Sequence, residues 1–309
     1  MVGASCIGMF WADSALAISW TFWDTYSSSG VPSKLTDNST KLPSDLRNKL
    51  LALLPEGQNI NNNAKSKALI DDDQGANIFL KADATVTISY IAEGAGYLNS
   101  LAFFNFNTAD FDNVTALNNS TIKDKVIFPN FSAAPDGKMY FGGTVSLNKV
   151  LANTAIGFTC ISNGWKSSAK TVNGSQRSNA IFRSIKRLNP EPSTNNLNAH
   201  NVLLVDTVNE VIVVGFEDLN REKSSNNDNG YASDNDFNDV IFAIKVTPFS
   251  AVDLTHSKDI EGKTIPPTNP TPTPISAEGK SGPMSWREVT TPPAVVDPVK
   301  DARAQSRKK

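Results

Sequence analysis

The sequence predicts a mostly β protein, an antiparallel β-sandwich with jelly-roll-like topology, and three features support this fold class. Short apolar runs of strand length recur between residues 71 and 246, with turn-forming residues between them. The 16 Phe residues and the many Thr residues suit the half-buried surface of a pleated sheet. Helical segments do not alternate with these runs, which argues against a parallel α/β sheet. A chain of 309 residues is long enough for one sandwich domain with flanking segments.

The first 17 residues, MVGASCIGMFWADSALA, are typical of a secretory signal peptide. They are mostly apolar or small and end in Ala15-Leu16-Ala17, which fits the small-residue rule for signal cleavage, although no Lys or Arg precedes the apolar stretch. No later stretch approaches the roughly 20 apolar residues that cross a bilayer. We therefore expect an exported protein without a membrane span, secreted or at the cell surface, in the periplasm or outside the cell.

Residues 18–70 are predicted to form a strand, a short helix and a loop that pack on the core. The run ISWTFWDTY is aromatic and β-prone. In LRNKLLALL, leucines recur at helical spacing, Ser44 is placed to cap the start of the helix, and Pro55 follows its end.

Residues 71–254 are predicted to form the sandwich domain. The run TVTISYIAEG alternates apolar residues, and SLAFFNFN follows the turn-prone GAGYLN, so these two strands are predicted to pair as a hairpin. Cys160 lies in an apolar run and is expected to be a buried core residue. Further strands are predicted in DKVIFP, TVSLNKV, TAIGFTCIS, NAIFRSI, HNVLLVD, EVIVVGFED and NDVIFAIKV.

Residues 255–309 are rich in proline and poor in apolar side chains, so we predict a disordered tail there. The whole chain carries 29 basic and 31 acidic residues, a formal net charge of −2, which indicates no nucleic-acid partner. With two Cys and two His in the chain, neither a zinc site nor a catalytic thiol with its base is indicated. We expect no enzyme and predict no catalytic residue.

The stretch from Glu217 to Asp239 is rich in Asp, Glu and Asn. Crowded carboxylates repel one another, and Ca²⁺ is the cation that takes many oxygen ligands in irregular geometry. Asp234, Asp236 and Asn238 are spaced two apart, like the first ligands of an EF-hand, but the sixth position holds Asp239 instead of glycine, so this is no EF-hand. If the flanking strands pair, both acidic halves meet at one end of a sheet. Composition alone leaves a solvated acidic loop, whose Asp and Asn form turns, as an open alternative.

Five segments of this chain, in this order, resemble the bacterial domain of unknown function 4114: AEGAGYLNSLAFFNF, AIGFTCISNGW, LNPE, HNVLLVD and VVGFEDL…SDNDFNDVIFAI. The resemblance covers about residues 71 to 246. It implies a β-sandwich-like extracellular module, found in exported proteins and often beside large surface adhesins, that binds calcium and has no established catalytic activity.

The resemblance also implies the metal ligands, residue by residue. Asp228 lies in a longer insert and is left out, and His200 is expected to hydrogen-bond an acid of the site. Other matching positions, Gly96, Tyr97, Asn99, Gly164 and Trp165, are interpreted mainly as structural. The implied Ca²⁺ ligands are Glu217, Asp218, Asp234, Asp236, Asn238 and Asp239.

The sequence therefore predicts an exported, calcium-binding structural or adhesive module without catalytic activity. Its expected partners are cell-surface or extracellular matrix components or glycans. One alternative is a calcium-dependent, lectin-like glycan-binding module in which Trp165, Tyr97 and Tyr231 form a stacking face. A less favoured one is a glycoside hydrolase with two catalytic carboxylates. Crowded acids suit a cation better than two carboxyl groups with separated pKa values.

Overall fold

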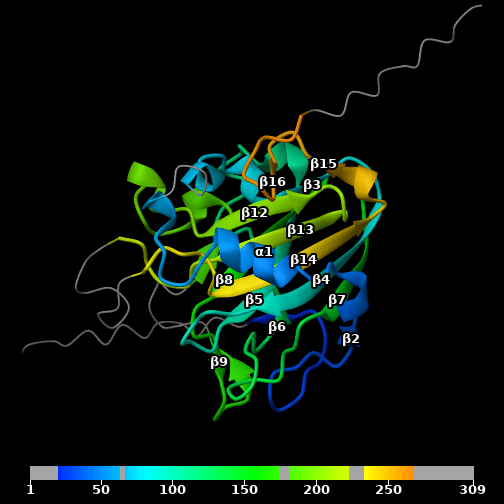
Figure 1. Cartoon of the computed structure of the whole chain (residues 1–309), viewed down its shortest axis with the longest axis vertical. Coiled ribbons are helices and arrows are strands. Elements are labelled where there is room, and N and C mark those ends of the chain that lie inside the picture. Colours follow the sequence, from blue (N-terminus) through cyan, green and yellow to red (C-terminus); the bar gives the residue numbers. More distant parts are fainter. Residues whose placement is uncertain (1–19, 63–66, 174–180, 223–232, 267–309) are drawn as a thin grey trace, which may run out of the picture. The chain divides into compact units, whose positions relative to one another are not determined.

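The computed structural model describes residues 20–62, 67–173, 181–222 and 233–266. Two seven-stranded sheets dominate these residues and confirm the mostly β fold (Figure 1). The predicted signal peptide, residues 1–17, lies outside the described residues, and so does the tail from residue 267 onward.

The first sheet has the strand order β1-β6-β5-β8-β3-β15, and β11 pairs with β8. Most neighbours are antiparallel, but β1 runs parallel to β6, so the sheet is mixed. Its strands are β1 (Thr21–Phe22), β3 (Ile78–Leu80), β5 (Ser100–Asn107), β6 (Lys125–Phe128), β8 (Thr154–Ile161), β11 (Ile181–Arg183) and β15 (Val252–Asp253).

The second sheet has the order β16-β12-β13-β14-β4-β7-β2, and β16 runs parallel to β12. A separate ribbon pairs β9 (Trp165–Lys166) with β10 (Thr171–Val172). The strands of the second sheet are β2 (Thr36–Asp37), β4 (Ala84–Ala92), β7 (Gly143–Val150), β12 (Asn201–Asp206), β13 (Val211–Phe216), β14 (Val240–Thr247) and β16 (Lys258–Asp259).

The chain crosses repeatedly from one sheet to the other between β3 and β8, as jelly-roll-like topology requires, whereas β12, β13 and β14 form a meander within one sheet. Apolar side chains of both sheets meet in one core. Phe158 of β8 and Phe242 of β14 contact across the layers with ring centroids 4.9 Å apart. Cys160 is fully buried in this core as a free thiol, as predicted.

The predicted hairpin of the β4 and β5 segments is wrong. β5 pairs along its whole length with β8 in the first sheet, while β4 lies between β14 and β7 in the second. The apolar residues of both strands, such as Ile88 and Phe103, instead face the common core from opposite layers. The turn-prone residues 93–99 therefore carry the chain between the sheets.

The predicted N-terminal helix is present as α1 (Leu46–Leu53), but its start differs from the prediction. The residue before the helix is Asp45, not Ser44, and no side chain caps the first turn. The Asp45 carboxylate forms an ion pair with Lys49 at 2.8 Å instead. Short 3₁₀ helices lie at Ser39–Lys41, Ile60–Asn62, Ala68–Ile70, Gln74–Ala76, Thr108–Asp110, Lys186–Leu188, Thr194–Asn196 and Phe249–Ala251.

Helix α1 covers the outer face of the second sheet, in front of β13 and β14 in Figure 1. Leu46 and Leu50 are fully buried there against residues such as Val213 and Ile241. Strands buried on both faces need apolar residues at every position, which explains the unbroken run VIVVGF of β13.

Packing continues beyond residue 254, where the predicted tail begins. β16 pairs with β12, and Ile265 is only 7% exposed within the core between the sheets. Among the described helices, none has the length and apolar character to cross a bilayer.

Candidate metal site

The β13–β14 hairpin brings the two acidic halves together, as the sequence predicted. Phe216 at the end of β13 pairs with Val240 at the start of β14. Glu217 directly follows β13 and Asp239 directly precedes β14, so these two acids lie side by side at the end of the sheet. The backbone N–H of Asp218 donates to Asp239 Oδ2 at 2.9 Å and closes this junction.

Three carboxylates from both halves form the first group. Glu217, Asp236 and Asp239 each offer an oxygen within 4.8 Å of the others. Oxygen ligands of one Ca²⁺ lie about 2.3–2.6 Å from the ion, so two ligands on opposite sides of it are about 5 Å apart. One cation therefore fits between the three side chains with small adjustments.

Burial makes ionisation of this group costly without a counter-ion. It raises the pKa of Glu217 to about 8, an effect that Asp218 and Asp234 reinforce. It raises the pKa of Asp236 to about 6, and it holds the pKa of Asp239 well above its usual range together with the charges of Asp218 and Glu217. A bound cation removes this cost because it stabilises the charged carboxylates.

Two buried oxygens at the site have no hydrogen-bond donor. They are Glu217 Oε2 and Asn238 Oδ1, in side chains whose residues are 1% and 2% exposed. Buried acceptors are almost always paired, so each requires a partner that the protein itself does not provide. A calcium ion, which takes oxygen ligands alone, is such a partner.

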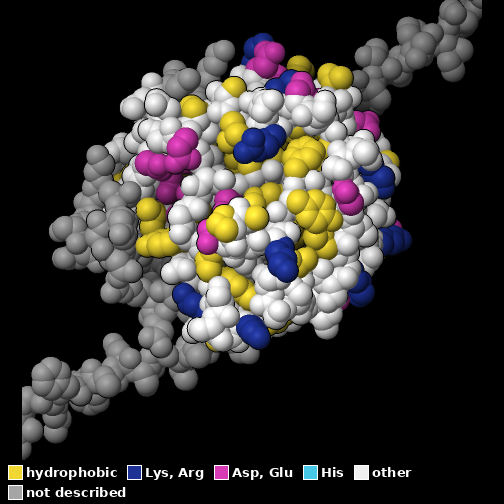
Figure 2. Space-filling view, turned by 60° about the horizontal axis from the view of Figure 1, so that its bottom comes forward, with side chains coloured by type: hydrophobic (Ala, Val, Ile, Leu, Met, Phe, Trp, Pro, Cys, Tyr) yellow, Lys and Arg dark blue, Asp and Glu magenta, His cyan; other side chains and the backbone are white. Residues whose placement is uncertain are grey.

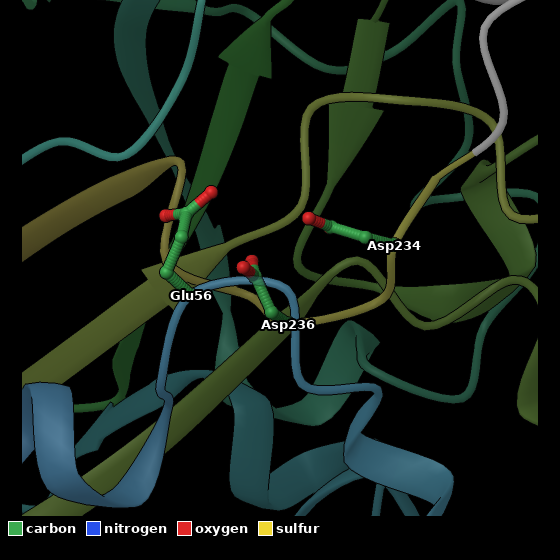
Figure 3. A group of neighbouring side chains, drawn as sticks. All are labelled: Glu56, Asp234 and Asp236. Carbon is green, nitrogen blue, oxygen red and sulfur yellow. The ribbon is translucent and has the colours of Figure 1, made fainter.

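A second group consists of Glu56, Asp234 and Asp236, whose oxygens also lie within 4.8 Å of one another. Figure 3 shows Asp234 pointing toward the other two carboxylates from the loop before β14. Glu56 follows α1, and the N–H of the next residue, Gly57, donates to Asp236 Oδ2 at 2.8 Å. Sequence reasoning missed Glu56, because a lone acid after Pro55 carries no pattern.

Alternate residues of the acidic loop face opposite sides, as the spacing predicted. Asp234 and Asp236 join the carboxylate groups, whereas Asn235 and Phe237 turn toward Arg221. Arg221 Nε donates to Asn235 Oδ1 at 2.7 Å, and its guanidinium lies 4.8 Å from the centroid of the Phe237 ring. Asn235 and Phe237 have φ of 62° and 60°, a left-handed backbone that is costly for Phe and persists only where the surroundings enforce it.

His200 contacts the backbone of the site at Glu217, but among the described residues it makes no hydrogen bond to the side chain of a predicted ligand. Its Nδ1 lies 3.0 Å from the backbone oxygen of Glu217, which can only accept, so Nδ1 carries the proton. Nε2 lies 2.8 Å from Glu191 Oε1. The acid that His200 binds is thus Glu191, which is outside the predicted set. The imidazole ring of His200 stacks on the Phe182 ring, with the ring centroids 3.8 Å apart.

Asp218 lines the same region yet belongs to neither carboxylate group within 4.8 Å among the residues that the structure describes. Asn99 Nδ2 donates to Asp218 Oδ2 at 2.6 Å, and Asn99 Oδ1 accepts from the N–H of Asn163 at 2.9 Å. The β4–β5 crossing is thereby tied to the acidic site. Asp228 and Tyr231 lie outside the described residues.

A pocket of about 430 Å³ opens over the acids. Of the aromatic residues considered for a stacking face, Tyr97 lines it, whereas Trp165 is 2% exposed and packs edge-on against Tyr26 in an apolar cluster. Among the described residues that line the pocket, five are acidic and none is basic. Its lining residues are Glu56, Gly94, Gly96, Tyr97, Glu217, Asp218, Leu219, Asp234 and Asp239.

Basic residues do not gather on the face that Figure 2 shows. Lys and Arg side chains are scattered over it, and a group of Asp and Glu side chains lies together toward one side. The described residues on this face therefore form no basic stripe of the kind that binds nucleic acid.

Comparison with known proteins identifies one family. Residues 150–247 match the model of the Domain of unknown function (DUF4114), which confirms the resemblance over these residues. The match contains the whole β13–β14 hairpin with its acidic loop, and Glu56 and Gly94 lie outside it. No curated protein and no solved structure matches the chain.

Proposed function

Starting from the DUF4114 match at residues 150–247, we propose that this protein is an exported, non-catalytic module that binds calcium at its β13–β14 hairpin. The observation that carries this proposal is Glu217 Oε2, a buried oxygen without a donor in a group of three carboxylates. The group offers oxygen ligands alone, which suit calcium, whereas zinc favours imidazole and thiolate.

The calcium ion acts as a structural clamp in this proposal. It neutralises carboxylates that otherwise repel one another, and it joins the two ends of the acidic loop. Calcium is plentiful outside cells, so even a weak site is filled there. The clamped module is a structural or adhesive unit, and its partners are cell-surface or extracellular matrix components.

Thermal unfolding of the chain tests this proposal. Millimolar calcium is expected to raise the Tm by several degrees over excess chelator, because a ligand at about 100 times its Kd adds about 2.7 kcal/mol to the free energy of unfolding. Magnesium demands regular octahedral geometry and is expected to act weakly. An unchanged Tm with calcium would mean that the acidic loop is solvated and empty.

Substitutions sharpen this test. Asp236→Ala or Asp239→Ala is expected to lower calcium affinity at least about tenfold, the lower end of what even outer-shell changes cost at metal sites. Glu222→Ala is the matched control, because Glu222 is an exposed acid at the start of the same loop and belongs to neither carboxylate group. Titration calorimetry measures all three, and equal losses would indicate diffuse screening in place of a site.

A second candidate function, calcium-dependent glycan binding, is supported by Tyr97. This half-buried aromatic residue lines the same pocket as the carboxylates, where a sugar could stack while its hydroxyls complete the shell of the ion. A glycan array read with calcium and with chelator distinguishes the two functions. Binding that requires both calcium and Tyr97 would establish the lectin-like role.

A further inference from the structure

We propose that the acidic pocket holds a second cation subsite, formed by Glu56, Asp234 and Asn238 with Asp236 at its base. This inference rests on the proposed function, since it adds a second ion to the one held by Glu217, Asp236 and Asp239. Its ligand chemistry is the same, a hard divalent cation with calcium as the natural occupant.

The carboxylates do not converge on one point. Among the described residues they form two groups that share Asp236, one with Glu217 and Asp239 and one with Glu56 and Asp234. Asp236 is held between these groups by three donors: Gly57 N at 2.8 Å, Asn238 N at 3.1 Å and Asn238 Nδ2 at 2.9 Å. Its carboxylate therefore has a fixed orientation with acids on either side.

Each group has its own unpaired buried oxygen. Glu217 Oε2 belongs to the first group, and Asn238 Oδ1 borders the second. The amide nitrogen of Asn238 donates to Leu54 O at 3.2 Å and to Asp236 Oδ2, which fixes the side-chain orientation and leaves Oδ1 without a donor. A single cation bound at Glu217 would leave Asn238 Oδ1 without a partner.

Gly94 shows where Asn238 Oδ1 points. A Cβ built on Gly94 would lie 2.1 Å from Asn238 Oδ1 and 2.9 Å from Glu56 Oε2. The two oxygens are therefore no more than 5.0 Å apart, and the Cα of Gly94 packs closely beside them. Two oxygen ligands of one calcium ion lie up to about 5 Å apart, because each is about 2.3–2.6 Å from the ion, so the spacing of Asn238 Oδ1 and Glu56 Oε2 suits a shared cation.

The second subsite joins segments far apart in the sequence. Glu56 follows α1, Gly94 lies in the crossing from β4 to β5, and Asp234 precedes β14. Glu56 and Asp234 are exposed, so water completes the shell, and this ion exchanges more readily than the buried one. The occupied subsite ties α1 to the acidic loop.

Calcium stoichiometry of the whole chain, measured by native mass spectrometry and titration calorimetry, tests the inference. We expect two ions in the unmodified protein and one in Glu56→Gln, which keeps the shape of the side chain but removes its charge. Gly94→Ala is also expected to bind one ion, because the added methyl would collide with Asn238 Oδ1 and displace it. Glu222→Gln is the matched control and keeps two ions, since Glu222 is exposed and belongs to neither carboxylate group.

The outcomes separate this inference from the proposed function. One ion in the unmodified protein, or a number that Glu56→Gln and Gly94→Ala leave unchanged, overturns the second subsite while the calcium site at Glu217 stands. No bound calcium at all overturns both. Loss of one ion in both variants, with Glu217→Gln losing the other, establishes two subsites. Circular dichroism of each variant confirms that it is folded.

Discussion

Glu217 combines the properties that a metal ligand needs. It is 1% exposed, its Oε2 has no donor, and its backbone oxygen is bonded by His200, the residue before the neighbouring strand β12. Arg221 supplies a buried positive charge nearby, but its nitrogens bind Asn235, Asn196 and Ala199, so the hydrogen bonds that the structure assigns to it go to other residues. The acidic site thus keeps ligand capacity that this internal cation does not use.

The raised pKa of Glu217 predicts how stability depends on pH without calcium. Burial raises this pKa from 4.5 to about 8, so the folded chain retains a proton that the unfolded chain releases. The resulting stabilisation is complete below about pH 4.5 and is lost as the pH rises toward about 8. Burial also raises the pKa of Asp236 from 3.8 to about 6, so its contribution to stability is lost in the same direction as the pH rises.

We therefore expect the Tm of the calcium-free chain to fall between about pH 5 and about pH 8, and saturating calcium to flatten this decline because the ion replaces the protons. Calorimetric scans at several pH values measure both. Glu217→Gln, which cannot titrate, is the control and should show a shallower decline without calcium. A calcium-free Tm that rises over this range would contradict the assignment.

At the scale of elements, α1 and the second sheet depend on each other. The helix is short, so its stability comes from the apolar face that it packs on β13 and β14. The same packing sets the position of Pro55 and Glu56 directly after the helix and of Gly57 beside Asp236. The helix therefore positions one side of the acidic pocket.

Leu50→Ala tests this dependence. Leu50 is a fully buried residue of α1, and removing such a side chain costs about 2–5 kcal/mol of unfolding free energy. Leu151→Ala, at a leucine that is 59% exposed, should change it by less than about 0.5 kcal/mol. Urea denaturation measures both, and similar effects for the two variants would show that α1 is not packed.

At the scale of the whole molecule, the sandwich extends past the boundary that composition indicated. Residues 255–266 lie at the start of the proline-rich stretch, yet β16 adds to the edge of the second sheet and Ile265 enters the core. Polar segments can pack in this way when a few apolar residues find a site on a sheet that is already formed.

Ile265→Ala is expected to lower the free energy of unfolding by about 2–4 kcal/mol, because a buried Ile is truncated. Val208→Ala is the control, since Val208 is 88% exposed. Thermal and urea unfolding of the whole chain compare the two. No difference between them would mean that the chain leaves the sandwich before residue 265.

The sequence by itself determined the fold class, the longer strands, the helix and the acidic loop, whereas short strands such as β2, β3 and β16 were not predicted. These are local properties, because alternation, apolar runs and turn residues act over a few neighbours. The hairpin that joins Glu217 to Asp239 could also be predicted, since consecutive strands with a loop between them usually pair. The six predicted ligands all lie at or beside the site for this reason.

Only the tertiary structure decided which sheet each strand joins and which distant residues reach the acids. β5 pairs with β8 instead of β4, and this pairing extends over all of β5. It forms only once the chain has folded back to bring β8 beside β5. Glu56 and Gly94 enter the pocket through the packing of α1 and the crossing between the sheets. Such contacts depend on the shape of the folded core, which no short stretch of sequence specifies.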